Sequence, residues 1–230
     1  MARTPAYDRD DFLRRLTALF WARGFARVSI DEIVESTGVS RSSLYAAYPD
    51  KTALFVAALE HYLGTVTRAN LERLGEGENA ALAIRRFLLH VAGQRPAPGA
   101  PTHGCLLTNT ATELGAEPRV ARLVSGAFCR MERALARRLV QARRQGDLSP
   151  ATEPGQFARQ LVTLIQGIRV MTRLGAEPRV VHDAVRSALA PLRAKTARSH
   201  RRRKHEQDTA AHRGAGAVRR HAGRRQMAAR

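Results

Sequence analysis

The chain has 230 residues, of which 44% are hydrophobic, enough for one sizeable globular domain or two small domains that share a core. Lysine and arginine number 39 against 20 acidic residues, and the formal net charge of +19 favours a polyanionic partner, most simply nucleic acid. With two cysteines, no signal peptide and no apolar run of about 20 residues, we expect a cytoplasmic protein without a disulfide framework or a membrane span.

Helical periodicity and capping residues predict helices from the N-terminus onward, and no segment reads as a strand. Asp10 is the predicted N-cap of a first helix that ends near Gly24. Ser29 and Glu32 have the spacing of a capping box, which predicts a short second helix that ends at Gly38.

Ser40 predicts the start of a third helix, with Val39 and Leu44 at the two positions of a hydrophobic staple. Asp50 predicts the start of a longer fourth helix that extends to about Leu74. Two short helices joined by the turn "STGVS" predict a helix-turn-helix, whose second helix enters the major groove of DNA.

The C-terminal part is expected to add five helices, at residues 78–93, 105–114, 118–145, 156–174 and 178–191. The heptapeptide "LGAEPRV" occurs at 114–120 and again at 174–180. We interpret both copies as a joint in which a glycine ends one helix and a proline begins the next.

The predicted fold class is therefore all-α, with nine helices in two domains and a tail. Residues 1–55 would form a DNA-binding head, and residues 56–192 would bind an effector and dimerise. The segment 193–230 carries 13 lysines and arginines against 2 acids and almost no large aliphatic residues, so we expect it to be disordered.

Five residues are predicted to contact DNA. In a helix-turn-helix, the first turn of the third helix and the start of the fourth helix face the groove. Arg41 can contact guanine or phosphate, and Tyr45 offers a hydroxyl to phosphate. Ser42 and Ser43 allow a close approach of the backbone, and Lys51 is placed to bind a phosphate.

The segment "SIDEIVESTGVSRSSLYAAYPDKTAL" resembles the DNA-binding segment of TetR-type transcriptional regulators. The shared features are the capping serine, the Gly-Val turn, the Leu-Tyr pair and the aromatic residue followed three positions later by lysine. They extend over residues 12 to about 62, and "GCLLTNTATEL" is similar to a stretch found in one branch of the family.

The resemblance implies a homodimer that reads a palindromic operator on double-stranded DNA, usually as a repressor, and that an effector releases. It also implies that Arg41, Ser42, Ser43 and Tyr45 contact the operator. Ala46 and Ala47 stand where the family often has histidine or an aromatic residue, which removes one potential DNA contact per subunit.

Polar residues within apolar helix faces are candidates for binding a small-molecule or electrophile effector. Cys105 is distinctive, because it follows Gly104 at a predicted helix start that would favour a thiolate, although the favoured interpretation is a structural role as a small half-buried residue that opens the helix. Cys129, beside Phe128 and Met131, is predicted to pack in the core. The candidate effector-binding residues are His61, His90, Cys105, Thr108, Asn109 and Glu113.

A broad apolar stripe on the last two helices is expected to pair with a second copy in a four-helix bundle. The predicted dimerisation residues are Phe157, Leu161, Leu164, Ile168, Val181 and Val185.

No metal-ligand spacing, phosphate loop or catalytic triad pattern is present, so we expect neither an enzyme nor a cofactor. One alternative is a general nucleic-acid-binding protein that relies on its basic tail. Another is a small-molecule-binding helical protein whose DNA head is vestigial.

Overall fold

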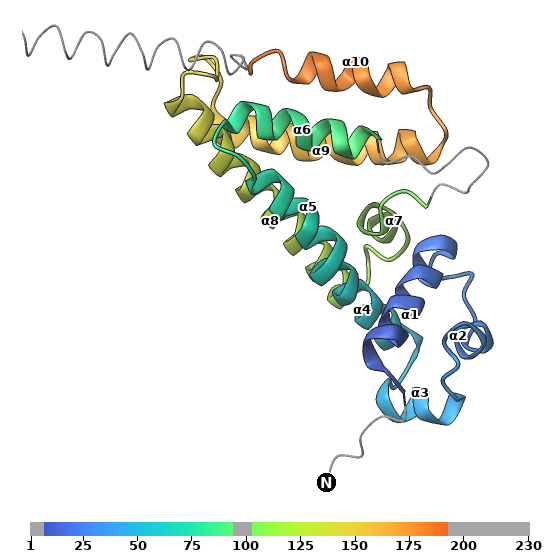
Figure 1. Ribbon diagram of the computed structural model, residues 1–230. Coiled ribbons are helices and arrows are strands. Elements are labelled where there is room, and N and C mark those ends of the chain that lie inside the picture. The colour runs from blue at the N-terminus through green and yellow to red at the C-terminus, as the bar shows by residue number, and fades with distance from the viewer. Residues whose placement is uncertain (1–6, 94–102, 193–230) are drawn as a thin grey trace, which may run out of the picture. The chain divides into compact units, whose positions relative to one another are not determined.

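The computed structural model describes residues 7–93 and 103–192, and these residues are helical apart from loops and one isolated bridge between Leu148 and Leu192 (Figure 1). The predicted disorder of residues 193–230 concerns a segment that lies outside the described residues. The helices are α1 (Arg9–Arg23), α2 (Ile30–Thr37), α3 (Arg41–Ala47), α4 (Lys51–Tyr62), η1 (Leu63–Thr67), α5 (Arg68–Gly75), α6 (Ala80–Gly93), α7 (Leu106–Glu113), α8 (Pro118–Arg144), α9 (Pro154–Arg173) and α10 (Pro178–Ala188).

The all-α, nine-helix prediction is confirmed for the described residues when α4, η1 and α5, which follow one another without a break, count as one helix. The short π-helix η1 in its middle was not predicted. None of the described helices is long and apolar enough to cross a membrane.

The N-terminal helices begin where side chains satisfy their free backbone N–H groups. Ser29 and Glu32 form the predicted capping box, and Asp50 accepts from the backbone N–H of Ala53 at 2.7 Å. The first helix differs from the prediction, because its N-cap is Asp8, whereas Asp10 lies in the first turn and donates its own N–H to the Asp8 carboxylate at 2.9 Å.

The head, formed by α1, α2, α3 and the start of α4, encloses its own apolar core. Phe20 of α1 lies edge-on to Phe55 of α4, with 5.0 Å between ring centroids. Ile33 of α2 and Leu44 of α3 are 0% and 1% exposed, so both short helices are anchored through one large side chain each. The buried side chains of this core include Phe12, Leu16, Phe20, Val28, Ile33, Val39, Leu44, Leu54, Phe55 and Leu59.

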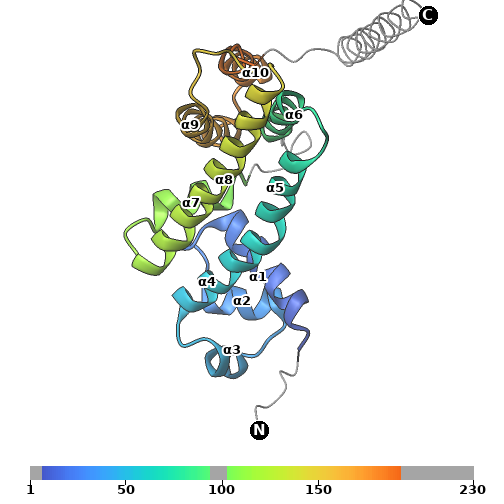
Figure 2. The same cartoon turned by 90° about the vertical axis from the view of Figure 1, so that its left-hand side faces the viewer.

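The second group of helices is built around α8 and α9, which pack along each other, while α6 contacts both of them and α10 contacts α6 and α9 (Figure 2). The continuous run from α4 to α5 leaves the head and lies against α8. Helix α7 contacts α4, α8 and α9, and thus lies between the head and these helices.

The two copies of "LGAEPRV" form similar joints but not identical ones. Pro118 and Pro178 begin their helices as predicted, each preceded by a glutamate at the N-cap. Gly175 has the left-handed backbone (φ 76) that the prediction requires. At the first joint, however, the C-cap is Leu114 and Gly115 does not have a positive φ, so the predicted glycine cap is wrong there.

Candidate nucleic-acid interface

The turn between α2 and α3 is fixed by local hydrogen bonds. Thr37 donates its hydroxyl to the Ile33 carbonyl at 2.6 Å and accepts from the N–H of Val39 at 3.3 Å. Between them Gly38 adopts φ 74, a left-handed conformation that glycine reaches at little cost. The α2–α3 segment is thus a helix-turn-helix, with Val39 and Leu44 buried on its inner side as the staple predicts.

The first turn of α3 presents polar side chains to solvent. The Ser40 hydroxyl accepts from the backbone N–H of Ser43 at 3.3 Å and lies 3.1 Å from the hydroxyl of Ser42. Tyr45 is 46% exposed, next to Leu44, which is 1% exposed. Helix α3 therefore has one anchored face and one face that is free to contact a ligand.

Arg41 lies at the start of α3 and pairs with the carboxylate of Asp31 in α2. This hydrogen bond and the charge of Asp31 raise the pKa of the Arg41 guanidinium above its usual value. Both side chains are exposed, so solvent screens the pair and Arg41 can exchange this partner for a phosphate or a base.

Lys51, the first residue of α4, is engaged within the head. Its Nζ lies 4.5 Å from the centroid of the Phe25 ring and 3.5 Å from the Ala26 carbonyl oxygen. Tyr48, at the end of α3, stacks on Phe12 at 5.9 Å between centroids. Burial raises the pKa of the Tyr48 phenol.

The six candidate effector residues lie on three elements: His61 on α4, His90 on α6, and the other four along α7 from its N-cap Cys105 to its last residue Glu113. Thr108 is buried and donates its hydroxyl to Gln166 of α9 at 2.8 Å, and Asn109 donates to the His103 carbonyl at 2.8 Å. His61 and His90 are half-buried, and burial lowers the pKa of His90 together with nearby arginines. The carboxylate of Glu113 faces the head instead.

Cys105 lies at the N-cap of α7, as predicted, and contacts residues that the sequence did not single out. Its Sγ is 3.7 Å from the Tyr62 hydroxyl, and Tyr62 lies edge-on to Trp21 at 5.1 Å. Trp21 donates its indole N–H to the Gly104 carbonyl at 3.1 Å. Burial, and next the neighbouring Cys105, raise the pKa of Tyr62 well above its usual value.

The predicted core position of Cys129 is wrong. Cys129 is exposed, because it lies on the outer side of α8 and not in the core. Five of the six predicted dimerisation residues are buried within the chain itself, so their side chains already contribute to its own core, and their pairing with a second copy stays a prediction. These five are Phe157, Leu161, Ile168, Val181 and Val185, and Leu164 is half-buried.

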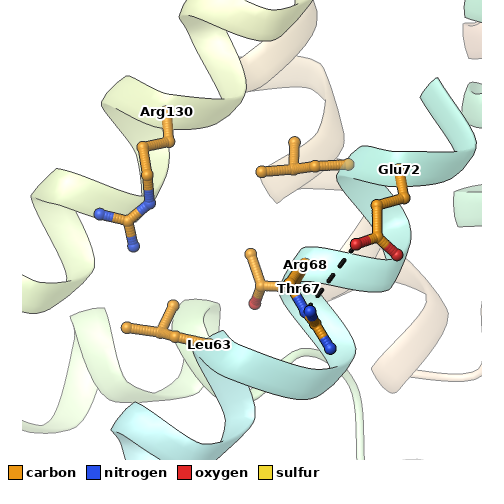
Figure 3. Close-up of a pocket in the computed structure, with 6 residues that line it drawn as sticks. Leu63, Thr67, Arg68, Glu72 and Arg130 are labelled. Carbon is orange, nitrogen blue, oxygen red and sulfur yellow. Dashed lines mark ion pairs between the residues drawn. The ribbon is translucent and has the colours of Figure 1, made fainter. Parts of the chain in front are cut away.

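A pocket of about 410 Å³ opens beside the π-helix, between η1, α5 and α8 (Figure 3). Arg68 and Glu72 form an exposed ion pair at 3.8 Å on one side of it, and Arg130 of α8 lies on the other. None of the candidate effector residues lines this pocket. Among the described residues, no three His, Cys, Asp or Glu side chains are grouped so that they could hold a metal ion.

An exposed helix-turn-helix on an otherwise helical chain defines a DNA-binding protein, and the comparisons with known proteins agree. Residues 13–58 match the family model "Bacterial regulatory proteins, tetR family", and residues 83–189 match "Tetracyclin repressor-like, C-terminal domain". The chain belongs to the TetR family and is a DNA-binding transcriptional regulator.

Individual relatives are identical to the chain at about a quarter of the aligned positions. The chain is 28% identical to the HTH-type transcriptional repressor ComR of Escherichia coli K12 over 76% of this chain and 83% of that protein. It is 26% identical to the regulator AcuR of Cereibacter sphaeroides over 72% and 76% of the two chains. A cysteine mutant of the TetR family regulator CifR, solved with 26-base-pair operator DNA, superposes with a TM-score of 0.71 at 26% identity, over 83% of this chain and all of that one.

Proposed function

We propose that this protein is a homodimeric repressor that reads a palindromic operator and is released by an effector. The observation that carries the proposal is the division of α3 into an anchored and a free face, with Leu44 buried and Arg41 and Tyr45 outside. Residues 1–55 are the head in this proposal, residues 56–192 bind the effector and the second subunit, and residues 193–230 add non-specific attraction to DNA.

The operator contacts are assigned to the exposed start of α3 and to the start of α4. Arg41, Ser42, Ser43 and Tyr45 contact the duplex, and Lys51 binds a phosphate. The similar protein CifR, solved with operator DNA, and the similar repressor ComR support DNA binding by this chain. The existing contacts of Lys51 with Phe25 and Ala26 would hold its ammonium group close to where the backbone of the DNA passes.

For the second subunit we propose a surface different from the buried stripe. Large apolar side chains remain exposed along the outer side of α9 and at the start of α10, and Leu174 is 77% exposed. Exposed apolar surface of this kind is typical of an interface between subunits. Its residues are Val170, Met171, Leu174 and Val180.

For the effector we propose a site at the N-terminal end of α7, where Cys105 contacts Tyr62 of α4. An electrophile that forms a C–S bond with Cys105 would place its bulk against Tyr62, whose ring packs on Trp21 of α1. A change at this point would therefore reach the head directly. The pocket beside η1 is the second candidate and would suit a ligand that binds without a covalent bond.

Selection of bound sequences from random duplex DNA tests the proposal. Wild type should enrich an inverted repeat, and Arg41→Ala should lose preference at one base pair in each half-site, by roughly 1 to 3 kcal/mol for a bidentate contact. Lys51→Ala should weaken binding to all sequences alike.

Deletion of residues 193–230 separates the proposal from a general nucleic-acid-binding protein. A truncated chain that still enriches the inverted repeat supports the proposal. If the truncated chain no longer prefers any sequence, the general nucleic-acid-binding protein is favoured. If the full chain enriches no sequence at all, the DNA-binding head is vestigial.

A further inference from the structure

Glu113, the last residue of α7, is bound by the head through two hydrogen bonds. Its Oε2 accepts from the backbone N–H of Phe25 at 2.9 Å, and its Oε1 accepts from the N–H of Ala26 at 2.6 Å. These two residues lie in the turn that connects α1 to α2. One carboxylate thus joins the end of α7 to a turn whose two donor residues lie 88 and 87 positions earlier in the sequence.

The backbone of this turn depends on a glycine beside the carboxylate. Gly24, which precedes the two donors, has φ 79 and ψ 170. This combination is open almost only to glycine. A Cβ at Gly24 would lie 3.0 Å from Oε2 of Glu113, so the glycine also leaves room for the carboxylate.

Lys51 contacts the same two residues of the turn. Its ammonium group lies over the Phe25 ring and near the Ala26 carbonyl oxygen. The Phe25 ring is held edge-on against Phe55 of α4 at 5.4 Å between centroids. Phe25 and Ala26 are therefore contacted both by a carboxylate from α7 and by a cation from the start of α4.

We propose that Glu113 is a positioning residue for DNA binding, which holds the α1–α2 turn and, through it, places the Lys51 ammonium for contact with a phosphate. This inference rests on the proposed function, because it assumes that Lys51 meets the operator. Glu113 itself lies on α7 and does not contact DNA.

The experiment compares Glu113→Ala and Glu113→Gln with wild type on a duplex that wild type has selected. Glu76→Gln, which makes the same charge change at an exposed residue directly after α5, is the matched control. Affinity is measured at several salt concentrations, and circular dichroism checks that each variant is folded at the assay temperature.

We expect Glu113→Ala to weaken binding roughly tenfold, because hydrogen bonds to a charged group are lost. The DNA affinity of Glu113→Gln should lie between those of Glu113→Ala and wild type, because the amide oxygen of glutamine still accepts one hydrogen bond. Glu76→Gln should bind like wild type, apart from the small effect of one charge.

The salt dependence distinguishes positioning from mere stability. If Lys51 loses its phosphate, the slope of log K against log salt should fall by about 0.9 for each subunit. Lys51→Ala alone should lower the slope by the same amount. The double variant Lys51→Ala/Glu113→Ala should have the same slope as Lys51→Ala.

Weaker binding of folded Glu113→Ala with an unchanged slope would overturn the inference, as would wild-type affinity and slope in both variants. Either result leaves the proposed function intact, because wild type and the Arg41→Ala variant test that independently. If wild type selects no duplex at all, both the proposed function and this inference fail.

Discussion

Replacement of Gly38 by alanine tests whether the angle between α2 and α3 depends on a single backbone conformation. Gly38 has φ 74 and ψ 4, and a Cβ placed on it would meet nothing within 4 Å. The cost of Gly38→Ala therefore comes from the backbone alone, without any clash.

The left-handed conformation costs an L-residue roughly 1 to 2 kcal/mol. The lower entropy of the unfolded alanine chain offsets about 0.4 to 1 kcal/mol of this. We expect the free energy of unfolding to fall by about 1 kcal/mol as the balance of these two effects. Gly38→Asn should lower the free energy of unfolding by less than Gly38→Ala does, because asparagine tolerates the left-handed region.

Urea unfolding followed by circular dichroism, at one fixed protein concentration, measures the change. Gly64→Ala is the matched control, because Gly64 also has open space around it but no positive φ, and the variant should be at least as stable as wild type. The reasoning is refuted if Gly38→Ala is as stable as wild type, or if Gly64→Ala is destabilised equally.

Two further predictions concern the C-terminal part. Leu174→Glu should shift the protein from dimer toward monomer in sedimentation, because it places a charge in the proposed apolar interface, whereas Glu76→Gln should not; an unchanged dimer would exclude this surface. Treatment with N-ethylmaleimide should release operator DNA from wild type and from Cys129→Ser but not from Cys105→Ser, since the proposal places the responsive thiol at Cys105, and the exposed Cys129 is the control. Equal release from both variants would exclude Cys105 as the responsive thiol.

The sequence predicted the helices well because their start and end signals are local. The capping box of Ser29 and Glu32 and the glycine at position 38 act within a few residues of themselves. Where a signal depends on distant packing, the prediction failed. The two copies of the same heptapeptide differ at Gly115 and Gly175 although their letters are identical, so the difference must come from residues outside the heptapeptide.

In the candidate site, too, local features were predicted from the sequence and contacts between distant residues were not. The anchoring of α3 by Leu44 follows from spacing alone, but the partners of Glu113 are backbone N–H groups, which carry no sequence signal. The contact between Cys105 and Tyr62 joins residues 43 apart. Hydrophobic periodicity also cannot tell a stripe that packs within one chain, such as Leu161 and Val185, from a stripe that pairs with another.

The π-helix η1 accommodates one extra residue in the helix that connects the head to α6. A π-turn holds one residue more than an α-turn, so deleting a residue from Leu63–Thr67 would restore regular α-helical hydrogen bonding. Because the wider turn takes up the extra residue, the same deletion should leave the downstream helix close to its present rotation relative to the head. Leu74, which is 1% exposed, and Tyr62, which is 3% exposed, should both stay buried. Homologous chains that lack the extra residue can therefore keep both buried contacts.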